Sequence, residues 1–124
     1  MDKILIIQDS PTVNAMLKFR LESAGFSVET AETGREGVEK AKGFPSQLIL
    51  LDYNLPDLNG SEVCRILKGA EQTGHIPVIF MSAKDEDKLS RITKEAGADG
   101  YIGLPFDGKM FVDKMSRFFK ERHP

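Results

Sequence analysis

Two carboxylates and one hydroxyl each stand within two residues of the end of a short apolar run: Asp9, Asp52 and Ser82. Two carboxylates at one place suit Mg²⁺, which binds a few carboxylates together with waters and phosphate oxygens. A carboxylate beside such a metal can act as a nucleophile toward a phosphoryl group, and a hydroxyl can donate a hydrogen bond to the transferred oxygens. These residue types therefore indicate phosphoryl chemistry, provided that the fold brings them together.

The apolar runs themselves predict β-strands. Three of them are continuous and rich in β-branched residues, as in strands buried on both faces, and they cover residues 4–7, 48–51 and 78–81. Two further segments, residues 27–31 and 100–103, are predicted to be half-exposed edge strands, because the first alternates in polarity and the second is short and bracketed by glycine.

Helical spacing fills the intervals between these strands. The first helix has Ser10 as its cap, Pro11 at its first position and Gly25 at its exit. Its predicted buried stripe comprises Val13, Met16, Leu17, Leu21 and Ala24. The second helix opens with Thr33 and Glu36 at capping-box spacing, and its interior Gly37 carries a cost relative to alanine.

The three remaining helices are predicted from similar stripes. The third carries Val63, Ile66 and Leu67 after Gly60, and the fourth carries Leu89, Ile92 and Ala96 before Gly97. The last starts at Asp107 as its cap and presents Phe111, Met115, Phe118 and Phe119. Strands and helices alternate throughout, which predicts an α/β, doubly wound, five-stranded parallel sheet. With the continuous runs inside, the strand order is 2-1-3-4-5, and ligands bind beyond the carboxyl ends of the strands.

Composition limits the other possibilities. The chain has 124 residues and a net charge of −2, which fits one domain spanning 1–124. With one cysteine, Cys64, it can form no intrachain disulfide. No apolar run is long enough to span a bilayer, so we expect a cytoplasmic protein that does not enter membranes. The sequence has no dense basic tract of the kind that predicts nucleic-acid binding. We therefore expect the partners to be proteins or small ligands.

From end to end the sequence resembles the receiver domains of two-component response regulators, the CheY-like domains with a flavodoxin-like (βα)5 fold. The segment from Asp52 to Gly60, DYNLPDLNG, carries much of the resemblance. It implies that Asp52 accepts a phosphoryl group from a sensor histidine kinase or phosphotransfer protein. It also implies Mg²⁺ ligands at Asp9, Asp52 and the main-chain carbonyl of Asn54.

The resemblance further implies a conformational switch that a downstream effector protein reads. Its residues would be Ser82, which follows the phosphoryl group, and Tyr101, which turns inward on activation. Taken alone, Ser82 is also typical of a helix cap, and Tyr101 of an aromatic packed on an edge strand. The segment Pro105-Phe106 matches the one that follows the fifth strand in the family, where a cis bond usually precedes the proline.

Two positions depart from the family. Gln8 stands where a second acid is usual, and Leu104 stands where a lysine is usual. The charge of the site is preserved, but a neutral amide oxygen at Gln8, itself a candidate ligand, attracts Mg²⁺ less strongly. Leu104 removes a charge-assisted hydrogen bond worth ~1.5–3 kcal/mol. We therefore expect weaker Mg²⁺ binding and impaired phosphorylation; Lys84 is either a substitute cation or a solvated surface lysine.

Two functions remain open at this point. The first is a phosphoacceptor signalling module, not an enzyme beyond its own phosphorylation and dephosphorylation. The second is an atypical receiver that acts as a phosphorylation-independent interaction module, which Gln8 and Leu104 favour. A phosphatase of the dehalogenase type fits poorly, because Asn54 stands where its second acid is required.

Overall fold

The computed structural model describes residues 2–104 and 108–123, and strands and helices alternate along them. The strands are β1 (Lys3–Ile7), β2 (Ser27–Ala31), β3 (Leu48–Asp52), β4 (Val78–Ser82) and β5 (Gly100–Gly103). The helices are α1 (Pro11–Ser23), α2 (Gly34–Gly43), α3 (Gly60–Gly69), α4 (Glu86–Ala96) and α5 (Gly108–Arg122). All strand pairs are parallel in the order β2-β1-β3-β4-β5, which confirms the predicted topology.

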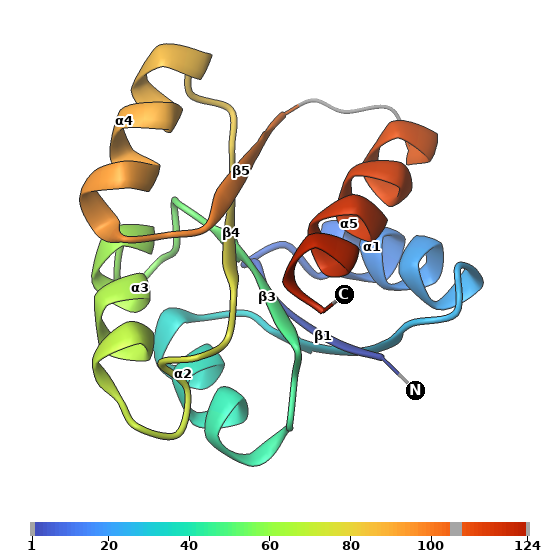
Figure 1. The fold of residues 1–124 in the computed structure, drawn as a ribbon, viewed down its shortest axis with the longest axis horizontal. Coiled ribbons are helices and arrows are strands. Elements are labelled where there is room, and N and C mark those ends of the chain that lie inside the picture. The colour runs from blue at the N-terminus through green and yellow to red at the C-terminus, as the bar shows by residue number, and fades with distance from the viewer. Residues whose placement is uncertain (1, 105–107, 124) are drawn as a thin grey trace.

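Helices cover both faces of this sheet. Helices α1 and α5 lie on one face, and α2, α3 and α4 lie on the other (Figure 1). Every residue of β3 and β4 is buried, whereas β2 and β5 at the edges are partly exposed. The contrast between continuous and alternating runs was therefore a correct guide to strand position, because a central strand contacts helices on both sides. None of the described helices is long and apolar enough to cross a membrane.

The helix ends follow local chemistry. Ser10 and Asp85 cap α1 and α4, each accepting a backbone hydrogen bond from the first turn, and Pro11 is the first residue of α1. Gly25 and Gly97 each follow the end of a helix. Their φ angles are 99° and 77°, a conformation that glycine adopts without steric cost. The predicted cap Asp107 and the predicted cis bond before Pro105 lie outside the described residues, as does Phe106.

The capping box predicted at α2 is only half correct. The Thr33 hydroxyl accepts a hydrogen bond from the Glu36 N–H at 3.0 Å, but the Glu36 carboxylate accepts from the Glu32 N–H instead of that of Thr33. A complete capping box is present at α3. The Asn59 side chain accepts from the Glu62 N–H, and the Glu62 side chain accepts from the Asn59 N–H. In that helix Ile66, predicted to be buried, is 45% exposed.

The predicted stripe of α1 was wrong at two positions. Met16 is 48% exposed, and Ala24 is an exposed residue at the helix C-cap. Leu17 and Leu21 are fully buried, and Asn14 completes their face. Since each residue advances about 100° around an α-helix, Met16 points well away from the line of Leu17 and Leu21. A buried amide thus takes a place that hydrophobicity alone assigns to an apolar residue.

Close packing explains why a glycine stands at position 37 inside α2. A Cβ at this position would lie 2.5 Å from Cδ1 of Ile7, so glycine lets α2 approach β1 closely. Gly43 at the end of the same helix has no atom within 4 Å of such a Cβ, and its φ is not positive. The two glycines therefore form a matched pair, one required by packing and one not.

We expect Gly37→Ala to lower the free energy of unfolding by ~1–3 kcal/mol, because the added methyl group overpacks the core against Ile7. Gly43→Ala should raise it by up to ~1 kcal/mol through helix propensity alone. Urea denaturation of the two variants and the wild type measures both effects. Equal stabilities for the two variants would contradict the packing argument.

Candidate functional site

The predicted polar residues meet at one edge of the sheet. Strands β1 and β3 are neighbours with Ile7 opposite Leu51, so Asp9 and Asp52 lie at the carboxyl ends of adjacent strands. Ser82 ends β4, the next strand along. Asp52 and Ser82 are buried, whereas Asp9 is exposed. The two acids and the hydroxyl therefore share the edge at which ligands bind in such sheets.

The surroundings of the buried Asp52 carboxyl disfavour its ionised form. Burial raises the pKa of Asp52, and the negative charge of Asp9 raises it further. Hydrogen bonds from the Asn54 N–H, at 3.2 Å to Oδ1, and from the Gln8 side chain act in the opposite direction. Among the described residues, no ion pair includes Asp9 or Asp52. Two acids that no basic side chain neutralises are suited to a bound cation.

The loop after Asp52 is closed on itself by backbone contacts. Asn54 and Asn59 form an isolated antiparallel bridge, closed by a 2.7 Å hydrogen bond from the Gly60 N–H to the Tyr53 carbonyl. The closing bond uses the carbonyl of Tyr53 and leaves that of Asn54 outside the pairing. A Cβ on Gly60 would lie 2.8 Å from the Tyr53 Cα, so glycine allows this tight closure.

These oxygens fit Mg²⁺. The described residues contain no group of three or more His, Cys, Asp or Glu side chains that could hold a metal ion. Mg²⁺ does not need one, since one or two carboxylates plus waters and phosphate oxygens complete its shell. Asp9, Asp52 and the Asn54 carbonyl supply two carboxylates and one neutral oxygen. The Gln8 amide oxygen already accepts a hydrogen bond from the Ser10 N–H at 3.1 Å, which weakens it as a ligand.

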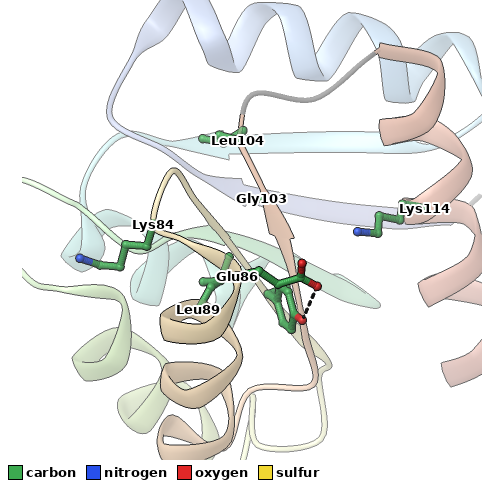
Figure 2. A pocket seen from close by; sticks show the side chains of 7 residues that line it. Lys84, Glu86, Leu89, Gly103, Leu104 and Lys114 are labelled. Carbon is green, nitrogen blue, oxygen red and sulfur yellow. Dashed lines mark hydrogen bonds between the residues drawn. The ribbon is translucent and has the colours of Figure 1, made fainter.

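Lys84 lies beside the site but is not paired with either acid. Its ammonium stands 5.2 Å from the centroid of the Tyr53 ring, a cation–π contact. In Figure 2 the side chain extends away from Gly103 and Leu104. The Lys84 N–H donates to the Ser82 Oγ at 3.1 Å, which leaves the Ser82 hydroxyl proton available for another acceptor.

Tyr101 is tied to the first turn of α4. Its hydroxyl donates a hydrogen bond to Glu86 Oε1 at 3.3 Å, drawn as a dashed line in Figure 2. The half-buried ring lines a pocket of about 390 Å³ between α4, β5 and α5, together with Lys84, Glu86, Leu89, Gly103, Leu104 and Lys114. The aromatic ring therefore forms part of the wall of this pocket.

Leu104 continues the backbone pattern of β5 with an apolar side chain, where the resemblance led us to expect a lysine. Its N–H donates to the Ser82 carbonyl at 2.8 Å, which holds the end of β5 against β4. The side chain is partly buried and packs on the core beneath α1 and α5. An apolar contact thus lies next to the strand that carries Ser82.

One residue of this region was missed by sequence reasoning. Asp57, in the loop between β3 and α3, accepts hydrogen bonds from the N–H groups of Gly34 and Arg35 at 2.8 and 3.0 Å. The only sequence signal is an Asp in a turn-rich segment, which is typical of loops in general. Its partners lie more than twenty residues away, where no local pattern connects them.

Cys64 is a small buried residue of α3. It is fully buried, and its thiol donates to the Ala96 carbonyl at 3.5 Å. Burial raises the pKa of the Cys64 thiol to about 11. A thiol of this kind is unreactive at neutral pH.

Comparison with known proteins agrees with this geometry. The response regulator receiver domain family matches residues 4–116. PhoP of Bacillus subtilis, a transcriptional regulatory protein of alkaline phosphatase synthesis, is 39% identical over 85 residues, 68% of this chain and 35% of PhoP. The chain thus spans about a third of that regulator's length. PilH of Pseudomonas aeruginosa is 39% identical over 87 residues, 70% of this chain and 72% of PilH.

Solved structures show the same fold. Chemotaxis protein CheY4 of Vibrio cholerae superposes with a TM-score of 0.88 at 28% identity, covering 94% of this chain and 98% of that one. A two-component response regulator from Clostridium difficile superposes with a TM-score of 0.90 over 100% of both chains, and its 24% identity supports the fold alone.

The chain therefore belongs to the response regulator receiver domains. Receiver domains are signalling modules of two-component systems, not enzymes in the usual sense. They interact with histidine kinases and effectors and typically bind Mg²⁺ at the phosphorylation site.

Proposed function

We propose that residues 1–124 act as one receiver domain in which Asp52 accepts a phosphoryl group from a phosphohistidine of a sensor kinase or phosphotransfer protein. The observation that carries this proposal is the buried Asp52 carboxylate at the strand edge, facing Asp9 and the Asn54 loop, with neither acid in an ion pair of the described residues.

In the transfer, a carboxylate oxygen of Asp52 forms a bond to phosphorus as the phosphorus–nitrogen bond of the phosphohistidine breaks, and the electron pair leaves with the imidazole nitrogen. The Asn54 N–H holds Oδ1 of Asp52 and orients the nucleophile. The Ser82 hydroxyl donates a hydrogen bond to a phosphoryl oxygen. Mg²⁺, held by Asp9, Asp52 and the Asn54 carbonyl, supplies positive charge next to the phosphoryl oxygens when bound.

Mg²⁺ binding should be weaker than is usual for the family. A neutral amide at Gln8 attracts a divalent cation far less than a carboxylate does. In addition, the Gln8 oxygen is engaged by the Ser10 N–H and its side chain hydrogen-bonds Asp52. Gln8 therefore orients the acceptor more than it binds the metal.

Signalling would follow from the residues around Ser82. When its hydroxyl turns to the phosphoryl group, it releases the Lys84 N–H and shifts the start of α4. Tyr101 then leaves Glu86 and enters the pocket, which alters the face formed by α4, β5 and α5 that an effector reads. The equilibrium between the two states is the quantity that phosphorylation changes.

Lys84 follows Ser82 by two residues and adds a positive charge next to the end of β4. We expect Lys84→Ala to slow phosphorylation by up to about fivefold, because exposed charge interactions contribute ~0.2–1 kcal/mol. Rates with a small phosphodonor and Mg²⁺ test this, with the exposed Lys88→Ala as the matched control. Equal phosphorylation rates for Lys84→Ala and the wild type would mean that Lys84 only packs on the Tyr53 ring and does not act as a substitute cation.

The proposed function is tested by incubating the protein with a small phosphodonor and Mg²⁺ and measuring its intact mass. We expect one phosphoryl adduct, which does not form when Mg²⁺ is omitted from the incubation. A wild-type protein that gains no adduct would favour the second candidate, a phosphorylation-independent interaction module, which the neutral residues Gln8 and Leu104 support.

A further inference from the structure

The loop between β3 and α3 is tied to a helix outside the site by the carboxylate of Asp57. Oδ1 accepts a hydrogen bond from the Gly34 N–H at 2.8 Å, and Oδ2 accepts one from the Arg35 N–H at 3.0 Å. Gly34 and Arg35 are the first two residues of α2, whose N–H groups have no partner inside the helix. Asp57 is thus a helix cap supplied by a distant segment.

Two cap residues divide the first turn of α2 between them. Thr33, the local cap, accepts from the Glu36 N–H, while Asp57 takes the two N–H groups before it. Burial raises the pKa of Asp57, but the hydrogen bonds from Arg35 and Gly34 outweigh burial, so that the pKa is lowered. The Arg35 guanidinium is 79% exposed and 3.7 Å away, so the backbone hydrogen bonds are the principal contact.

In the proposed function, the same loop carries the Asn54 carbonyl as a ligand of the cation. Its base is closed by the hydrogen bond from Gly60 to Tyr53, and the base continues into α3. Its tip has a separate anchor at Asp57, three residues after Asn54. A Cβ on Gly34 would lie 3.2 Å from Oδ1 of Asp57, so the start of α2 packs closely on this tip. With both ends held, the carbonyl has little freedom to move.

We propose that Asp57 is a positioning residue for the cation site, because its cap on α2 fixes the loop that carries the Asn54 carbonyl. It touches neither the acceptor nor the metal. This inference rests on the proposed function, in which Asn54 is a Mg²⁺ ligand. It explains why an acid stands at this loop position, where a turn alone would accept several residue types.

The test compares Asp57→Ala with Thr33→Ala, which removes the other cap of the same helix, a hydroxyl bonded to the Glu36 N–H. Calorimetric titration with MgCl₂ measures the dissociation constant of each variant. We expect Asp57→Ala to raise it by about 2- to 30-fold, the equivalent of losing one helix cap. Thr33→Ala should leave it unchanged, and Asp57→Asn, which keeps one acceptor oxygen, should fall between. Thermal unfolding verifies that the variants are folded.

Phosphorylation kinetics supply a second readout. For Asp57→Ala, the rate should require more Mg²⁺ but approach the wild-type rate at saturation, whereas a general structural defect would lower the maximum. Equal Mg²⁺ affinities of Asp57→Ala and the wild type, or equal losses in Asp57→Ala and Thr33→Ala, would overturn the inference alone. A wild-type protein without Mg²⁺ affinity would overturn it together with the proposed metal site, and a Mg²⁺-binding protein without an adduct would overturn only the phosphoacceptor function.

Discussion

Asp52→Asn protein is expected to gain no phosphoryl adduct when incubated with a small phosphodonor and Mg²⁺. An amide does not form the acyl phosphate, because it is neutral and its nitrogen lone pair is delocalised into the carbonyl, so it is a far weaker nucleophile than a carboxylate. Intact mass measures the adduct directly. Asp113→Asn, at an exposed acid on α5, serves as the control and should be labelled like the wild type. Full labelling of Asp52→Asn would mean that another residue is the acceptor.

The same variant should be more stable than the wild type at neutral pH without Mg²⁺. Because burial and Asp9 raise the pKa of Asp52 in the folded protein, the folded state binds a proton more readily than the unfolded state does. Ionised Asp52 therefore lowers stability at pH values above its folded pKa, and this loss disappears as the pH falls below the unfolded value. Asp52→Asn removes the charge and with it this pH dependence, which thermal unfolding over a pH series measures.

Leu104→Lys is expected to accelerate phosphorylation by about 10- to 100-fold, because it adds a charge-assisted hydrogen bond worth ~1.5–3 kcal/mol to the phosphoryl oxygens. The backbone is already in place, since the Leu104 N–H is bonded to the Ser82 carbonyl and this bond does not involve the side chain. A lysine stem can occupy part of the apolar contact while its ammonium reaches the site. Initial rates of adduct formation at fixed Mg²⁺ measure the gain.

Leu104→Met is the matched control, because it has a similar length and no charge. We expect it to react like the wild type. Some loss of stability should accompany Leu104→Lys, since Leu104 packs on the core beneath α1 and α5. If Leu104→Lys reacts no faster than Leu104→Met, the missing cation does not limit this site.

Most of the architecture was open to prediction because its causes are local or follow from few topologies. A run such as 48–51 is apolar at every position because helices cover both faces of β3, and the run alone therefore places the strand inside the sheet. Caps such as Ser10 bond within their own first turn. Once a parallel sheet was inferred, the common direction of its strands brought Asp9 and Asp52 to the same edge.

Contacts between segments that are distant in the sequence could be identified only from the tertiary structure. The Asp57 carboxylate caps backbone N–H groups of α2, and the Lys84 ammonium lies over the Tyr53 ring. No periodicity of the sequence encodes either contact. The buried Asn14, which donates to the Gln8 carbonyl at 2.7 Å, was absent from the predicted stripe of α1, because hydrophobicity ranks an amide as exposed unless its buried partner is known. Short-range patterns thus specified the elements and the strand-end acids. Close packing of those elements determined which polar groups meet, because a hydrogen bond depends on a few ångströms that sequence spacing does not define.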